Sequence, residues 1–346
     1  MRTETSGVTA SEPCLPPYSR QQERFLIQGL LRGVSRSFYL TLRVLPAAIR
    51  PQISLAYLLA RASDTIADTK AVAREERIRL LRDFAGAAPH ACPDLARFAG
   101  QPQEVSPTEE RLLARLPDSL AMLESLSEED QRLIHSLHHT IIAGQIFDLE
   151  KFPEDRLTAL ASDEELDRYT YLVAGCVGEF WTKMCMAHLR ELSDWDVNRM
   201  CELGVRFGKG LQLVNVLRDI PRDLRIGRCY LPVNDAERLL DPNNFTEIKP
   251  VYDRWLDVAL GHLDAGWEYT LAIPPSLTRL RLACIWPIWI GLKTIARLRV
   301  TNPLDPARRI KVSRGEVYWL MVESFLICRN DDALDEKFQR LRARAA

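Results

Sequence analysis

The sequence lacks the features that would place a chain of 346 residues among zinc modules, nucleic-acid-binding proteins or Rossmann-type enzymes. Its eight cysteines form no Cys-x-x-Cys pair and no cysteine–histidine spacing suited to zinc, which favours reduced, mostly buried thiols. A net charge of −1 supplies no basic field, so nucleic acid is not expected as a partner. No Gly-x-Gly-x-x-Gly segment opens a strand–helix unit, which excludes a Rossmann domain.

Long apolar runs are also absent. The first residues, MRTETSGVTASEPCLPPYSR, contain no apolar core of a signal peptide, and residues 1–19 are expected to form a flexible lead-in. The most apolar stretch, LACIWPIWIGL at 282–292, is too short to span a bilayer and is expected to be a buried helix. The terminal RLRARAA has no apolar segment either. We therefore expect a cytoplasmic protein that meets membranes only peripherally.

Strand-type alternation and internal repeats are missing as well, whereas helical periodicity is widespread. The sequence predicts an all-α fold, with one catalytic domain over 20–332 and a charged C-terminal tail over 333–346, because no linker separates two composition regimes. Apolar residues recur at helical spacing over 20–46, 50–85, 108–150, 163–190, 194–222, 250–271, 278–299 and 313–342.

One polar stripe interrupts an apolar helix in the segment YLLARASDTIAD. Steps of four, three and four residues place Tyr57, Arg61, Asp64 and Asp68 on a single face. The flanking residues are apolar, so this stripe is not the solvated side of an ordinary amphipathic helix. The alternative is an exposed helix end with an Arg61–Asp64 ion pair worth a few tenths of a kcal/mol.

A second stripe follows the same pattern with Gln212, Asn215, Asp219 and Asp223. Carboxylates in apolar surroundings are costly unless a cation neutralises them, and two such pairs on facing helices would form an oxygen-rich site. Mg²⁺ fits best, with Mn²⁺ as the alternative, and its usual completion by phosphate oxygens predicts a phosphorylated substrate. The expected metal ligands are Asp64, Asp68, Asp219 and Asp223. Pro221 predicts a distorted last turn at Asp223.

Arginines crowd the same segments and are candidates for binding phosphate oxygens in bidentate fashion. They are Arg61, Arg218, Arg222, Arg225 and Arg228.

Five elements occur in a characteristic order: SRSFY at 35–39, YLLARASDTIAD at 57–68, YLVAG at 171–175, LQLVNVLRDIPRD at 211–223 and GRCYLP at 227–232. Together they resemble the squalene/phytoene synthase family over roughly residues 22–330. The resemblance implies a single-domain isoprenoid synthase helical bundle, in which two diphosphates bind through Mg²⁺ to facing aspartate helices above a deep apolar cavity. Ala67 and Arg222 depart from common family residues and leave the number of metal ions open.

The implied reaction is the Mg²⁺-dependent head-to-head condensation of two farnesyl diphosphates through presqualene diphosphate to squalene, with NADPH as reductant. Asp64 and Asp219 are implied to be catalytic through the metal, and Tyr171 through proton transfer or a hydrogen bond to diphosphate. The implied substrate contacts are Ser35, Ser37, Phe38, Tyr57, Arg61, Gln212, Asn215, Arg218, Arg228 and Tyr230.

Two C-terminal stretches favour squalene as the product. CIWP at 284–287 and IKVSRGEV at 310–317 resemble segments of squalene synthases, and with them Asn215, Lys311 and Arg314 become candidate NADPH contacts. The alternatives are a phytoene or dehydrosqualene synthase without reduction, or a non-catalytic assembly factor of the family. Retention of all four aspartates disfavours the latter. The sequence leaves the oligomeric state open.

Overall fold

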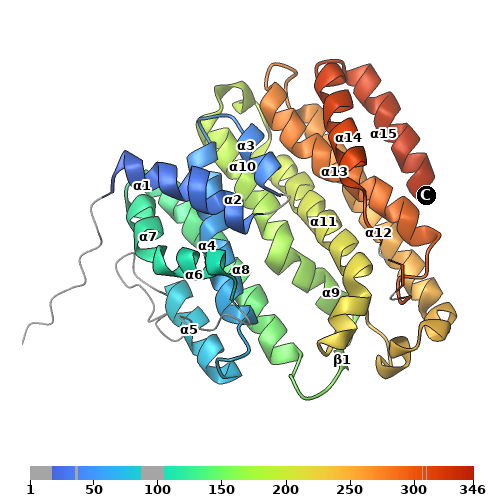
Figure 1. Cartoon of the computed structure of the whole chain (residues 1–346). Coiled ribbons are helices and arrows are strands. Elements are labelled where there is room, and N and C mark those ends of the chain that lie inside the picture. Colours follow the sequence, from blue (N-terminus) through green and yellow to red (C-terminus); the bar gives the residue numbers. More distant parts are fainter. Residues whose placement is uncertain (1–17, 36–37, 87–104, 306, 309) are drawn as a thin grey trace, which may run out of the picture.

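The computed structural model describes residues 18–35, 38–86, 105–305, 307, 308 and 310–346, and these form a bundle of helices (Figure 1). The all-α prediction is confirmed. The α-helices are α1 (Arg20–Arg24), α2 (Leu31–Val34), α3 (Phe38–Val44), α4 (Arg50–Asp68), α5 (Arg74–Gly86), α6 (Pro107–Ala114), α7 (Leu116–Glu124), α8 (Glu128–Lys151), α9 (Asp163–Thr170), α10 (Cys176–His188), α11 (Val197–Arg225), α12 (Phe245–Ala272), α13 (Thr278–Arg299), α14 (Arg314–Ile327) and α15 (Asp331–Ala345).

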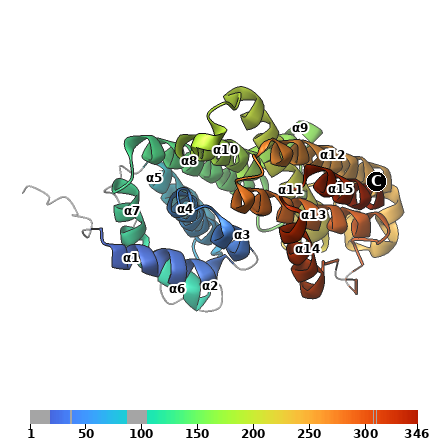
Figure 2. The same cartoon turned by 90° about the horizontal axis from the view of Figure 1, so that it is seen from above.

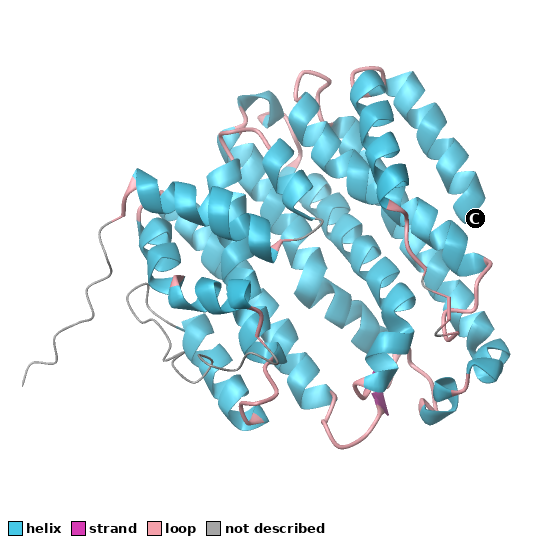
Figure 3. Ribbon diagram, viewed as in Figure 1, coloured by secondary structure: helices cyan, strands magenta, loops and turns pink. Residues whose placement is uncertain are grey.

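Shorter elements connect these helices. In the described part of the chain, two are π-helical turns, η1 (Phe25–Leu30) and η3 (Tyr171–Gly175), and three are 3₁₀ turns, η4 (Arg190–Leu192), η5 (Glu237–Leu240) and η6 (Pro242–Asn244). Strands within the described residues are limited to a parallel pair of two residues each, β1 (Thr158–Ala159) and β2 (Arg228–Cys229) (Figure 3). Gly227, with φ of 87°, makes the turn from α11 into β2.

Five of the predicted helices are divided in the structure: 20–46, 50–85, 108–150, 163–190 and 313–342. Two of the divisions occur where a polar side chain caps a new helix. The Ser127 hydroxyl accepts from the Asp130 amide at the start of α8, and the Asn330 side chain accepts from the Ala333 amide at the start of α15. The apolar spacing continues across these caps, so periodicity alone cannot detect them.

The last helix corrects the predicted domain boundary. Residues 333–346 are not a separate tail, because the boundary falls inside α15, whose Leu334, Phe338 and Leu341 are buried. Phe338 stacks on Trp267 of α12 with ring centroids 4.6 Å apart. The charged residues that suggested a tail lie on the outer side of a packed amphipathic helix.

Helix α11 contacts α10, α12 and α13 and carries the second aspartate stripe (Figures 1 and 2). It continues to Arg225, three residues beyond the predicted end, although Pro221 lies within it. Proline removes the donor that would bond the carbonyl of Leu217, four residues earlier. The hydroxyl of Tyr252 donates to that carbonyl at 3.3 Å instead. This contact from α12 allows Asp223 to remain within the helix.

Glycines let α11 approach α10 and the preceding turn η3 closely. A Cβ atom at Gly178 would overlap the backbone carbonyl of Gly204, and one at Gly208 would overlap that of Ala174. Backbone cannot move aside as a flexible side chain can, so both positions require glycine for steric reasons. The close crossing fixes the direction in which α11 presents its polar stripe.

We predict that Gly178→Ala destabilises the protein by about 1–3 kcal/mol or more, because the added methyl forces α10 away from α11. The measurement is the free energy of unfolding from chemical denaturation. Gly261→Ala on α12 is the control, since nothing lies within 4 Å of its added Cβ, and it should be stabilising by about 0.5–1 kcal/mol. Equal stability of the Gly178 variant and wild type would contradict the close crossing.

Candidate active site

A polar cavity of about 300 Å³ lies among α4, α8, α9, η3, α11 and β2, and we call it the carboxylate cavity. It brings together residues from segments that are far apart in the sequence. Its lining consists of Asp64, Ala67, Asp68, Gly144, Gln145, Asp148, Leu149, Tyr169, Val173, Gln212, Arg228 and Tyr230. The first aspartate stripe and part of the second therefore border one space.

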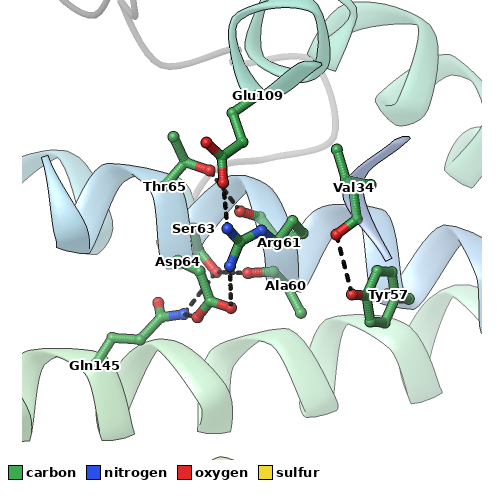
Figure 4. Close-up of polar contacts among 9 residues, drawn as sticks. All are labelled: Val34, Tyr57, Ala60, Arg61, Ser63, Asp64, Thr65, Glu109 and Gln145. Atoms are coloured by element: carbon green, nitrogen blue, oxygen red, sulfur yellow. Dashed lines mark hydrogen bonds and ion pairs between the residues drawn. The ribbon is translucent and has the colours of Figure 1, made fainter. Parts of the chain in front are cut away.

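Asp64 is held from two sides (Figure 4). The amide of Gln145 on α8 donates to its Oδ1 at 2.5 Å, and the Arg61 guanidinium lies 3.7 Å from its Oδ2. Burial, followed by the charge of Asp68, raises the pKa of Asp64 to about 6. The ionised carboxylate is thus incompletely compensated in the protein alone.

Arg61 lies between two acids, Asp64 and Glu109 of α6 (Figure 4). Its ion pair with Glu109 orients the guanidinium along α4, one helical turn before Asp64. The capping box of Ser106 and Glu109 fixes Glu109 in turn. Arg61 is therefore a preoriented cation beside the cavity.

Buried Arg77 secures the end of α4 that carries the aspartates. Its Nη1 donates to the carbonyl of Ala67 at 2.7 Å, and its Nη2 pairs with Glu154 in the loop after α8. The last carbonyls of a helix have no partners within the helix, and a cation there also complements the helix dipole. Arg77 thus helps to fix the position of Asp68, the last residue of α4.

Asp148 on α8 is a third acid that the sequence analysis missed. It accepts from Nη1 of Arg228 at 2.7 Å and from the Tyr230 hydroxyl at 2.7 and 3.0 Å. Burial raises its pKa to about 6, although Arg228 and Tyr230 oppose this, and Asp68 adds to it. Tyr169 stacks on Tyr230 with centroids 4.6 Å apart.

A signal for these residues exists in the segment GQIFDLEK. Gln145 and Asp148 are three apart within an apolar helical run, which is the same kind of pattern that identified Asp64 and Asp68. Tyr169 lies two residues before Tyr171, so its nearness to that predicted catalytic residue is a further signal in the sequence.

The second stripe extends from the cavity along α11. Gln212 lines the cavity, and the Asn215 amide lies 3.5 Å from its side-chain oxygen. Arg218 binds Asp219 in bidentate fashion at 2.8 and 2.6 Å. Burial, and then the charge of Asp219, raise the pKa of Asp223 to about 7, and Asp148 contributes to this rise. Asp148 therefore links the two aspartate pairs electrostatically.

Other predicted residues lie elsewhere. Tyr171 does not border the carboxylate cavity, and its hydroxyl lies 3.4 Å from Oε2 of Glu179. Buried Ser35 donates to the Leu31 carbonyl at 2.5 Å, and the Tyr57 hydroxyl lies 3.5 Å from the carbonyl of Val34. Lys311 and Arg314 are exposed at the start of α14, apart from this cavity. Ser37 and the side chain of Phe38 lie outside the described part of the structure.

The donor set fits a hard divalent cation. Within the described residues, no three acidic, histidine or cysteine side chains converge closely enough to hold a metal by themselves. Mg²⁺ in phosphate-binding sites commonly uses one or two carboxylates and completes its shell with water and phosphate oxygens. The carboxylates of Asp64 and Asp68, both on α4, suit that mode of binding. The raised pKa of Asp64 shows that its negative charge is not fully neutralised by the protein.

Solved structures share this fold. The solved structure of TcSQS with BPH1237 has a TM-score of 0.73 at 20% identity, covering 94% of this chain and 97% of that one. The model of the squalene/phytoene synthase family matches residues 31–316. The chain belongs to this family.

Two relatives differ in the activity that their names state. The squalene synthase of Eremothecium gossypii is 27% identical over 309 residues, which is 85% of this chain and 66% of that enzyme. The 15-cis-phytoene synthase of Synechocystis sp. is 27% identical over 292 residues, which is 81% of this chain and 77% of that enzyme. Sequence similarity therefore does not decide the product.

The raised pKa of Asp64 predicts a pH-dependent stability. Its pKa is about 6 in the folded protein, against 3.8 for an unperturbed aspartate, so folding favours the protonated form. The stabilisation that Asp64 contributes in its protonated form is fully present below about pH 4, and it is lost as the pH rises through 6. In metal-free buffer, Asp64→Asn should therefore stabilise the protein at pH 7.5 and not at pH 4. Chemical denaturation at both pH values measures this, with Asp257→Asn on α12 as the control. A destabilised Asp64 variant at pH 7.5 would contradict the electrostatic account.

Proposed function

We propose that the protein is a prenyltransferase that condenses two farnesyl diphosphates head to head, through presqualene diphosphate, to squalene, with Mg²⁺ and NADPH. Family membership supports the head-to-head condensation. The observation that carries the proposal is the carboxylate cavity, where acids of α4 and α8 meet Gln212 of α11 and Arg228 of β2.

The acids are proposed to hold Mg²⁺ together with substrate. Asp64 and Asp68 would bind it from α4, and Asp219 and Asp223 from α11, with Asp148 between them. Bound Mg²⁺ would neutralise the diphosphate and make it a better leaving group. Arg218 would have to exchange its contact with Asp219 for a phosphate oxygen as substrate binds.

The remaining polar groups would orient the diphosphates. Arg228 is fixed by Asp148 and can present its other guanidinium nitrogens to phosphate. Burial raises the pKa of Tyr169 well above its usual value, so its hydroxyl stays protonated and can donate a hydrogen bond. Ser35, Ser37, Phe38, Tyr57, Arg61, Gln212, Asn215 and Tyr230 are proposed as further substrate contacts.

Squalene, and not phytoene or dehydrosqualene, is proposed because of the two C-terminal segments. In the structure, residues 284–287 lie within α13 and residues 310–317 lead into α14, and side chains of the two segments connect these helices. Trp286 donates to the Ser324 hydroxyl at 2.9 Å, and Glu316 pairs with Lys293 and Arg297 of α13 at 2.8 and 2.7 Å. Lys311 and Arg314 flank this junction, and with Asn215 they are the proposed contacts to NADPH. A retained aspartate set disfavours a non-catalytic assembly factor.

Product identification tests this function directly. Purified protein is incubated with Mg²⁺ and farnesyl or geranylgeranyl diphosphate, with and without NADPH. We expect squalene from farnesyl diphosphate with NADPH, and presqualene diphosphate or water-quenched alcohols without it. Efficient formation of dehydrosqualene or phytoene in both conditions would support the alternative function, and no product from either substrate would contradict the condensation itself.

The two neighbouring tyrosines should have separable roles. Tyr169→Phe removes a hydroxyl from the carboxylate cavity. A hydrogen bond to a charged group contributes about 1.5–3 kcal/mol, so its loss should lower kcat/KM for the first half-reaction, the condensation to presqualene diphosphate, by about tenfold or more. Tyr171→Phe should spare that step and cause presqualene diphosphate to accumulate. Single-turnover product analysis measures both steps. An unaffected Tyr169 variant would remove this hydroxyl from the proposed mechanism.

A further inference from the structure

Helix α14 exposes a continuous apolar face, which we call the α14 face. It consists of Tyr318, Trp319, Val322, Phe325 and Leu326, whose exposed fractions are 59%, 68%, 53%, 66% and 77%. The positions follow i, i+1, i+4, i+7 and i+8, so they share one side of the helix. Five of the eleven large apolar side chains that are exposed in the described residues thus lie on this one helix.

The opposite side of α14 is packed against the protein. Leu320 and Ser324 are buried, and α14 contacts α13 and α15. Figure 2 shows α14 at the edge of the bundle, projecting past α13. The α14 face is therefore a ridge that points away from the core and plays no part in holding it together.

The charges of α14 are distributed so that no acid lies on the α14 face. Glu316 pairs with Lys293 and Arg297 of α13, and Glu323 pairs with Lys337 of α15 at 2.6 Å. Both acids of the helix are thereby turned toward the bundle and neutralised by cations of the neighbouring helices.

Exposed cations flank the α14 face at its two ends. Lys311 and Arg314 precede it, and Arg329 follows it. Asp331 and Asp332 begin the next helix, where Asp331 pairs with the buried Arg281. An apolar ridge with cations at its ends matches the interface of an anionic bilayer, where acyl chains lie beneath negative headgroups.

We propose that the α14 face docks on the surface of an anionic lipid bilayer. Tyrosine and tryptophan favour the headgroup level, whereas phenylalanine, leucine and valine enter the acyl boundary. At roughly 150–250 Å² per large side chain, the partly exposed residues offer on the order of 600 Å². The cations at both ends of the α14 face, with no acid on the face itself, match the negative headgroups of such a bilayer.

The docking surface goes beyond the proposed reaction. It shares Lys311 and Arg314 with the proposed NADPH contacts, and the test below changes neither residue. In the described residues no helix is long and apolar enough to cross a membrane, so the contact proposed here is one along the bilayer surface. Docking there would bring the protein to the bilayer, whose apolar interior dissolves long prenyl chains.

Vesicle co-sedimentation of the full chain tests the proposal without any measurement of turnover. The probes are vesicles of phosphatidylcholine alone and vesicles that also contain phosphatidylglycerol. We expect binding to the anionic vesicles that weakens with added salt. The double variant Trp319→Ser, Phe325→Ser should bind at least about tenfold more weakly, because it removes two of the large apolar side chains that the bilayer would bury. Val300→Ser, which changes an apolar residue that is 81% exposed outside α14, is the matched control.

Two results would overturn the proposal. One is the absence of anionic-vesicle binding, or equal binding by wild type and the double variant. The other is a wild-type dimer in sedimentation velocity that the double variant abolishes, because the α14 face would then be covered by a second copy. Circular dichroism of the double variant establishes that it is folded, which is expected because both changed side chains are exposed. Quenching of tryptophan fluorescence by brominated lipid, lost in Trp319→Phe, would locate the contact on α14 itself.

Discussion

The mutual repulsion of carboxylates in and beside the carboxylate cavity is the constraint on which the rest of this structure depends. Asp64, Asp148 and Asp223 all have pKa values raised by burial, and neighbouring acids raise each of them further. Because the pKa of each group is raised in the folded protein, ionising these carboxylates lowers the stability of the protein without a ligand. Under the proposed function, a cationic ligand would offset this cost by neutralising the carboxylates when it binds.

The surrounding fold keeps these acids from relaxing away from one another. Glycine contacts bring α10 against α11, Tyr252 supports the carbonyl that Pro221 leaves without its donor, and Arg77 holds the end of α4. The short β1–β2 pair sets Arg228 beside Asp148. Each of these contacts uses a different interaction, yet all of them restrict the same few side chains. These contacts would preorganise the cavity for the cation and diphosphate of the proposed function.

Sequence reasoning succeeded where a residue's position on a helix decides its environment. The helical class and the first aspartate stripe follow from spacing alone, and Asp64 and Asp68 do border the cavity with Gln212, Arg228 and Tyr230. It failed where contacts between distant parts of the chain decide which residues lie together. Gln145 and Asp148 do form a polar pattern in the sequence, but only the packing of α4 on α8 shows that this pattern meets the aspartates. The helix breaks at Ser127 and Asn330 depend on caps that apolar spacing does not reveal. Nor could spacing show that Tyr169, and not Tyr171, lines this cavity.

The central claim is that carboxylates from two helices bind diphosphate through a divalent cation, and calorimetric titration of inorganic diphosphate tests it most directly. The account predicts binding in the presence of Mg²⁺ and none in its absence. Asp64→Asn and Asp219→Asn, one from each helix, should each weaken that binding by at least about tenfold, or roughly 1.4 kcal/mol, while Asp257→Asn leaves it unchanged. Diphosphate binding that is equally strong without Mg²⁺, or that neither aspartate variant weakens, would contradict the account.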